Sequence, residues 1–130
     1  MELSLDEKGF GLESNYNICL DDVSYNIELV SKLDKELDGN RGIILYEELK
    51  ILLDKDLPPE LLILTAYHEL AHAICERTSF NSMLEEKLGE NGYEIFIDNL
   101  GRIIYNLFSN NDINLFNKLL KTYKIKQKGE

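Results

Sequence analysis

The sequence predicts an α+β protein with a β-rich first half and a helical second half. Two observations predict this class. Between Tyr16 and Leu29 apolar residues alternate with polar ones, which is the period of a strand with one buried face. From Ile63 onward they recur every three or four residues, which is the period of an amphipathic helix. The chain has 130 residues, enough for one hydrophobic core. We therefore expect a single domain, with a β-rich part over 1–55 and a helical part over 56–126.

Four short strands are expected, and we expect them to form a small antiparallel sheet. Asp21 and Asp22 interrupt the first alternation and predict a hairpin. Residues 31–37 could form either a short helix or a loop. The Gly-Asn-Arg-Gly sequence at 39–42 predicts a turn, and two further strands should follow over 42–45 and 49–53.

Three helical segments should follow the strands. The prolines and acidic residues of 56–60 are typical of a helix start, and the helical spacing continues to about Arg77. Ser82 and Glu85 match a capping box in front of a second helix, which should end at 109–111. A last amphipathic segment carries a lysine-rich tail, the only basic region of the chain.

Composition and charge exclude several function classes. The chain has 24 acidic and 14 basic residues and a formal net charge of −10. A surface of this sign repels phosphate backbones, so we expect no direct binding of nucleic acid. The longest apolar run, 61–66, is far shorter than the ~20 residues of a membrane span. The first residues do not resemble a signal peptide, and two cysteines are too few for a disulfide framework. We therefore expect a monomeric cytoplasmic protein.

The residues that indicate chemistry are the only two histidines of the chain, His68 and His72, with Glu69 beside the first. On a helix this H-E-x-x-H spacing puts both imidazoles one turn apart, so that they can bind one zinc ion per chain. Glu69 can hold the water that such a metal activates and accept its proton. The sequence therefore predicts His68 and His72 as metal ligands and Glu69 as the catalytic base.

A zinc site of this kind needs a third protein ligand. The metzincin pattern is excluded, because it would place Gly and His where the chain has Cys75 and Thr78. Cys75 itself could approach the metal, although a small buried side chain is the more common role of such a cysteine. The other candidates are carboxylates of the second helix, spaced by four and expected on one face: Glu86, Glu90, Glu94 and Asp98.

Among these carboxylates we expect Glu94 to be the third ligand. It lies where the apolar pattern of the helix is strongest, and a carboxylate in such surroundings needs a partner. Asp98, one turn further on, would accept the outer ring N–H of a histidine ligand and set its tautomer.

The H-E-x-x-H motif, followed by Glu94 after 22 residues and by Asp98 four residues later, resembles the gluzincin pattern. In length and layout the chain resembles the small phage and mobile-element metallopeptidases of the ImmA/IrrE type over residues 43–111. The resemblance implies a zincin-like fold, with an antiparallel sheet packed against the H-E-x-x-H helix and the Glu94 helix. That family's downstream motif usually ends in a Leu-Met-Pro-like turn, where this chain has Ser-Asn-Asn.

The expected function is zinc-dependent hydrolysis of a peptide bond in a protein or peptide substrate; the resemblance suggests a host or phage protein, for example a repressor. An extended substrate could add as a strand beside 49–53, with Glu48 and Lys50 flanking the groove. Arg77 or a tyrosine could stabilise the oxyanion of the reaction. The alternative is an acidic phage-type inhibitor that binds a host factor, in which the metal is absent or structural, with Cys75 as a fourth ligand.

Overall fold

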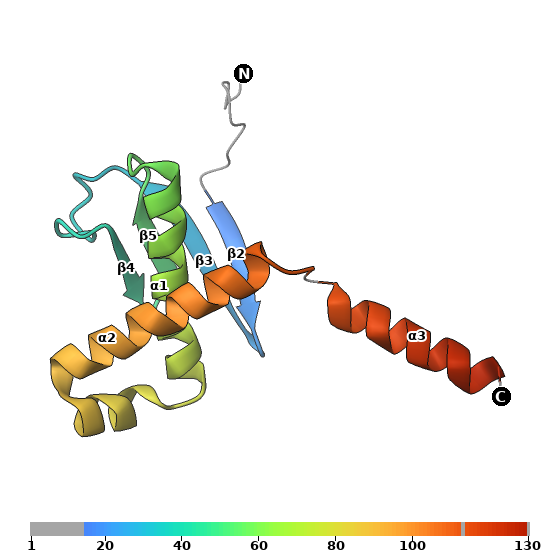
Figure 1. Cartoon of the computed structure of the whole chain (residues 1–130). Helices are drawn as coiled ribbons and strands as arrows, with labels where there is room; N and C mark the ends of the chain where they lie inside the picture. Colours follow the sequence, from blue (N-terminus) through green and yellow to red (C-terminus); the bar gives the residue numbers. More distant parts are fainter. Residues whose placement is uncertain (1–14, 113, 130) are drawn as a thin grey trace, which may run out of the picture.

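The computed structural model describes residues 15–112 and 114–129, which form a four-stranded sheet and three helices. The first helix packs against one face of the sheet, and the second crosses it on the side away from the sheet (Figure 1). The predicted α+β class is therefore confirmed. The elements in chain order are β2 (Asn15–Leu20), β3 (Val23–Val30), β4 (Gly42–Leu45), β5 (Lys50–Asp54), α1 (Pro59–Arg77), α2 (Asn81–Ser109) and α3 (Leu115–Gly129).

The alternation of the first segment produces the predicted hairpin of β2 and β3. Asp21 and Asp22 form the turn, and Leu20 pairs with Val23. Tyr25 is 1% exposed and belongs to a hydrophobic cluster. Alternate apolar residues of β2 and β3 contribute to this cluster, together with apolar residues of α1. The period of two therefore places one face of the hairpin against α1.

The sheet is mixed, so the predicted antiparallel sheet is wrong. Its strand order is β2-β3-β5-β4, with β5 parallel to β3 and antiparallel to β4. Ile51, Leu52 and Leu53 are apolar in succession, and each is at most 2% exposed. Successive side chains of a strand point to opposite faces, so both faces of β5 are buried there, as in an interior strand. Residues 31–41 form turns rather than a helix.

The position of β5 also corrects the predicted substrate edge. Residues 50–53 lie in the interior strand β5, and Leu49 ends the turn before it. Lys50 forms ion pairs with Glu28 and Glu48 instead of flanking a groove. In the described sheet the edge next to β5 is β4. A strand can add only at an edge, so β4 takes the place that the sequence had suggested for 49–53.

Helix α1 begins and ends close to the predicted bounds and is buried on two sides. Pro59 lies in its first turn. Backbone N–H groups of the first turn have no acceptor within the helix, so a proline there costs no hydrogen bond. Ala66 and Ala73 pack against the sheet, whereas Ala71 and Cys75 pack against α2. These small side chains let both layers approach the helix closely.

The predicted capping box at Ser82 is wrong. The N-cap residue of α2 is Phe80, and no side chain caps the helix. The amide of Phe80 donates to the carbonyl of Cys75 in the tight turn that ends α1, so α2 starts directly after that turn. Ser82 therefore lies inside the first turn of α2. Gly89, with a φ of 74°, interrupts the helical backbone of α2.

Gly101 brings α2 close to the middle of α1. A Cβ at this position would lie 2.9 Å from the carbonyl oxygen of Tyr67 and 3.1 Å from the backbone of His68. Only glycine allows the two helices to cross at this distance. The crossing places the α2 residues one and two turns before Gly101, Asp98 and Glu94, beside the histidines.

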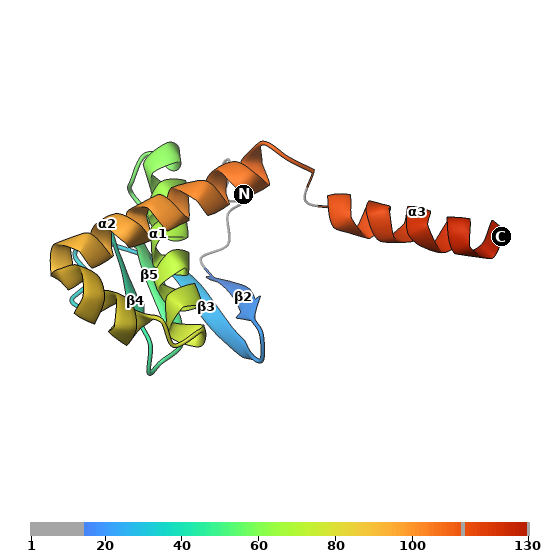
Figure 2. The same ribbon diagram turned by 60° about the horizontal axis from the view of Figure 1, so that its bottom comes forward.

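Helix α3 stands apart from the rest of the described chain in both views (Figure 2). Its apolar residues are exposed, among them Phe116, of which 78% is accessible to solvent. None of the described helices is long and apolar enough to span a membrane.

Candidate metal centre

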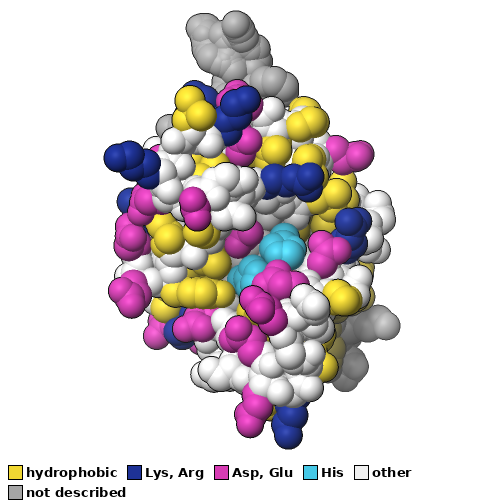
Figure 3. Space-filling model, turned by 90° about the vertical axis from the view of Figure 1, so that its left-hand side faces the viewer, with side chains coloured by type: hydrophobic (Ala, Val, Ile, Leu, Met, Phe, Trp, Pro, Cys, Tyr) yellow, Lys and Arg dark blue, Asp and Glu magenta, His cyan; other side chains and the backbone are white. Residues whose placement is uncertain are grey.

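Three of the predicted site residues meet at one point between α1 and α2. Nε2 of His68 lies 3.4 Å from Oε1 of Glu94, and Nε2 of His72 lies 3.7 Å from the same oxygen. Among the described residues this is the one group of three His, Cys, Asp or Glu side chains placed to hold a metal ion. The two histidines lie side by side near the middle of one face of the molecule, with carboxylates next to them (Figure 3).

Two of the three distances between ligand atoms are close to those around a tetrahedral zinc ion. Zinc bonds to nitrogen and oxygen of about 2.0–2.2 Å place neighbouring ligand atoms roughly 3.3–3.5 Å apart. The two distances to the Glu94 oxygen are close to this, and all three ligand atoms lie within 4.8 Å of one another. The Glu94 side chain is 51% exposed, so the group of three ligands is open to solvent on the side of Glu94. Three protein ligands with one open position are the pattern of catalytic rather than structural zinc sites.

Asp98 lies behind His68, at the place predicted for it. Its Oδ1 is 3.6 Å from Nδ1 of His68, and its Oδ2 accepts a hydrogen bond of 3.0 Å from Nε of Arg102. These contacts, the Arg102 hydrogen bond above all, lower the pKa of Asp98, so the carboxylate is charged at neutral pH. A carboxylate at Nδ1 favours the tautomer that leaves Nε2 free for a metal.

His72 is oriented by a chain of polar side chains that the sequence analysis missed. Its Nδ1 lies 2.9 Å from the hydroxyl of Tyr93, and that hydroxyl donates to Oδ1 of Asn81. The amide nitrogen of Asn81 in turn donates to Oε1 of Glu76 at 2.9 Å. Tyr93 and Asn81 are both buried. His72 and Glu76 are one turn apart on α1, but Asn81 and Tyr93 lie on α2, so no pattern in the sequence indicated the connection.

The hydrogen bonds that link His72, Tyr93, Asn81 and Glu76 all donate in the same direction, toward Glu76. The Glu76 carboxylate only accepts, so the amide nitrogen of Asn81 faces it and the amide oxygen faces Tyr93. Burial raises the pKa of Tyr93, which therefore keeps its proton and donates it to Asn81. The Tyr93 oxygen is then left to accept from Nδ1–H of His72. Burial also lowers the pKa of His72, so its neutral ring presents a lone pair at Nε2.

Glu69 is the buried carboxylate of the site. It is 8% exposed, and burial, followed by the charge of Glu94, raises its pKa to about 7. It lines a cavity of about 480 Å³ together with His68. A carboxyl group near its pKa at neutral pH, beside a candidate metal site, has the properties of a general base.

The remaining candidates lie elsewhere. Glu86 and Glu90 are exposed and outside the ligand group. The break at Gly89 separates Glu86 from the part of α2 that carries Glu94, and Glu90 lies just after the break, one turn before Glu94. Cys75 is buried among apolar side chains, and burial raises the pKa of its thiol. Arg77 binds Asp22 in the hairpin turn at 2.6 Å, so it is not free to stabilise an oxyanion.

We predict that Glu94→Ala weakens zinc binding by more than about 100-fold, because even residues that only orient zinc ligands are worth 10–100-fold. Glu86→Ala and Glu90→Ala should change the affinity less than about threefold. Titration of each metal-free protein against a zinc-binding dye measures the constants. A larger loss in either control than in Glu94→Ala would move the third ligand to that residue.

We predict that Tyr93→Phe shifts the metal-free His72 ring away from the Nδ1–H tautomer and weakens zinc binding about tenfold. The long-range ¹H–¹⁵N spectrum reports the tautomer directly, and with two histidines in the chain it contains only two ring systems. Tyr105→Phe is the matched control, because Tyr105 packs on Tyr67 and not on a histidine. An unchanged His72 tautomer and zinc affinity in Tyr93→Phe would contradict the orienting role.

Comparison of the chain with protein-family models, with curated proteins and with solved structures found no match.

Proposed function

We propose that this protein is a zinc-dependent metallopeptidase with a zincin-like arrangement, which hydrolyses a peptide bond in a protein or peptide substrate. The observation that carries the proposal is the position of Glu69. This buried carboxylate lines a cavity together with His68, beside the solvent-open ligand set of His68, His72 and Glu94. A site that served only to stabilise the fold would need neither the buried base nor the open side.

His68, His72 and Glu94 would hold the metal. Zinc supplies the Lewis acidity that lowers the pKa of a water molecule and polarises a carbonyl group. Glu69 takes the proton of the attacking water and passes it to the leaving amine. Asp98 and Tyr93 keep the two imidazoles in the tautomers that direct Nε2 toward the metal.

The edge strand β4 supports a peptide as the substrate. Gly42, its first residue, lines the same cavity as His68 and Glu69. Along this edge the backbone groups of β4 that face away from β5 have no strand partner within the described sheet. An extended peptide could bind there as a further strand and present its backbone to the site.

An acidic inhibitor with a closed metal site is the less favoured alternative. The form of this alternative in which the metal is structural calls for a fourth protein ligand, and Cys75, the residue suggested for it, lies in the apolar cluster between α1 and α2. Among the described residues the ligand group has three members, one fewer than a closed site needs.

The test is zinc content together with zinc-dependent cleavage. The protein purified without a tag should contain close to one zinc ion per chain by elemental analysis, and His68→Ala should contain none. Incubated with a mixture of peptides from digested cell protein, the wild type should produce new termini that disappear with a chelator and return with zinc. Zinc binding without any new termini would argue for the inhibitor. Absence of zinc in the wild type would refute the metal site.

A further inference from the structure

We propose that the groove beside the metal centre binds a carboxylate of the substrate through Arg41 and Arg102. This inference rests on the proposed peptidase function and adds a substrate class to it. The carboxylate can belong to an acidic side chain or to the C-terminus of the substrate, since both present the same group.

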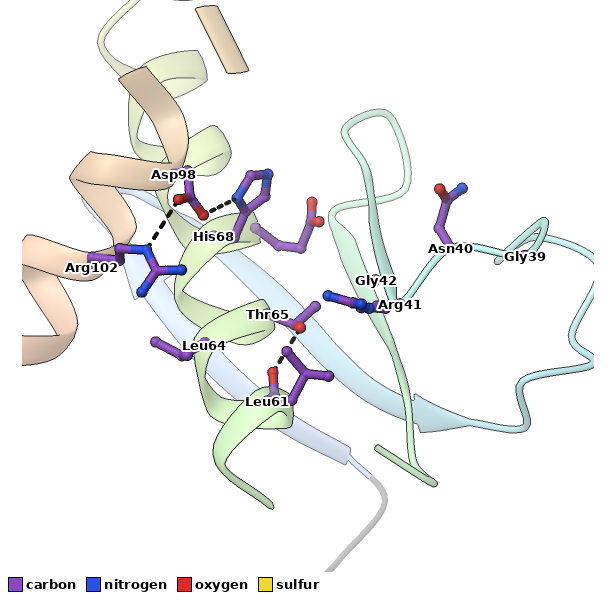
Figure 4. Close-up of a pocket in the computed structure, with 11 residues that line it drawn as sticks. Gly39, Asn40, Arg41, Gly42, Leu61, Leu64, Thr65, His68, Asp98 and Arg102 are labelled. Atoms are coloured by element: carbon purple, nitrogen blue, oxygen red, sulfur yellow. Dashed lines mark hydrogen bonds and ion pairs between the residues drawn. The ribbon is translucent and has the colours of Figure 1, made fainter. Parts of the chain in front are cut away.

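The groove runs along the exposed side of α1 and continues the metal centre. Its floor is formed by α1, with His68 and Glu69 at one end and Leu61 toward the start of the helix. Arg41 stands on the β4 side and Arg102 on α2, and both side chains point toward α1 between them (Figure 4). A substrate residue next to the cleaved bond would therefore lie between two guanidinium groups.

The arginines of the chain are concentrated at this groove. The chain has 14 basic residues, of which only Arg41, Arg77 and Arg102 are arginines. Two of the three line the same cavity. A guanidinium group binds carboxylates through two parallel hydrogen bonds, which the ammonium group of lysine cannot form. The residue type at these two positions therefore suits a carboxylate better than a general attraction to negative charge.

Arg41 carries a charge that the described part of the protein does not neutralise. It has no ion pair with any described residue, although the chain has 24 acidic residues. Its backbone is nevertheless held in place, because its carbonyl oxygen accepts a hydrogen bond of 2.9 Å from the amide of Asp54. A Cβ on the next residue, Gly42, would lie 2.7 Å from the Thr65 side chain, so the start of β4 is in contact with α1.

Arg102 has a different role on the opposite wall. Its Nε donates to Asp98, and 57% of the side chain is exposed, so its remaining N–H groups face the groove and solvent. Asp98 lines the same groove, and its charged carboxylate offsets much of the positive charge of Arg102. Arg41 is therefore the main attractive group, and Arg102 adds hydrogen bonds from the other side.

The experiment uses the full chain loaded with zinc and three hydroxamate peptides of one scaffold. The hydroxamate binds the metal, and the final residue is a glutamate amide, a glutamine with a free C-terminal carboxylate, or a glutamine amide. Isothermal titration calorimetry should show at least one carboxylate probe binding about five- to tenfold more tightly than the neutral glutamine amide. Which carboxylate probe gains affinity distinguishes an acidic side chain from a substrate C-terminus.

Arg41→Gln should reduce this preference to less than about twofold, without changing the affinity of the neutral probe. The matched control is Arg77→Gln, because Arg77 is bound to Asp22 outside the groove. Equal affinity of the three probes for the wild type, with zinc bound, would overturn the carboxylate site and leave the peptidase proposal intact. An equal loss in Arg77→Gln would overturn it as well. If no probe binds in a zinc-dependent way, the metal site fails and the carboxylate site fails with it.

Discussion

Glu69→Gln is expected to lower the rate of peptide hydrolysis by about 10²- to 10⁴-fold while zinc stays bound. Glutamine has the shape of glutamate but cannot accept a proton from water. The ligands His68, His72 and Glu94 are untouched, so the zinc content should equal that of the wild type. The rate is measured on the peptide that the wild type cleaves fastest, with elemental analysis of the same sample.

The control for this variant is Glu86→Gln, which removes one exposed carboxylate from α2 at no cost to the site. Its rate should lie within about twofold of the wild type. Retained hydrolysis in Glu69→Gln would exclude the general-base role. A loss of zinc in Glu69→Gln would show that the residue supports metal binding, and the rate would then no longer report on proton transfer.

His72→Ala is expected to abolish zinc binding and, with it, the stabilisation that zinc confers. The His72 side chain is only 12% exposed and is held by Tyr93, so alanine removes both a ligand and a buried contact. A ligand at about 1,000 times its dissociation constant stabilises the folded state by roughly 4 kcal/mol. For a chain of this size that corresponds to a rise in Tm of about 10 °C or more.

The measurement is thermal unfolding of both proteins, each with zinc and with a chelator. Zinc should raise the Tm of the wild type and leave that of His72→Ala unchanged, because binding energy at a ligand site is folding energy. Comparing each protein with itself removes the direct cost of the substitution. A rise in His72→Ala as large as in the wild type would mean that the metal is bound without His72.

The four candidate carboxylates of α2 show what the spacing of residues can predict about the site and what it cannot. Spacing by four predicted one helix face for Glu86, Glu90, Glu94 and Asp98, and the apolar pattern pointed to Glu94, which the structure places near both histidines. The break at Gly89 interrupts the helix between Glu86 and Glu90, and the close crossing at Gly101 places Glu94 and Asp98 beside the histidines. Propensity rules treat both glycines as unfavourable inside a helix. They predict neither the direction of the helix axis after Gly89 nor the helix crossing at Gly101.

For the sheet, the sequence does contain a signal for the interior position of β5. Ile51, Leu52 and Leu53 have no alternation, and a short apolar run of this kind is typical of a strand buried on both faces. That pattern puts β5 inside the sheet and leaves β4 at the edge. Strand direction cannot be read from the run itself, because it depends on how the loop over 31–41 returns the chain.

By itself the sequence determined the helical H-E-x-x-H motif, the hairpin and the bounds of α1, because each depends on residues within a few positions of one another. The tertiary structure alone decided what surrounds the motif. It brought Glu94 to His68 and His72, linked His72 through Tyr93 to Asn81, and placed Arg41 opposite Arg102. These contacts join separate elements. The crossing of α1 and α2 and the order of the strands set them, and periodicity along the chain carries no information about either.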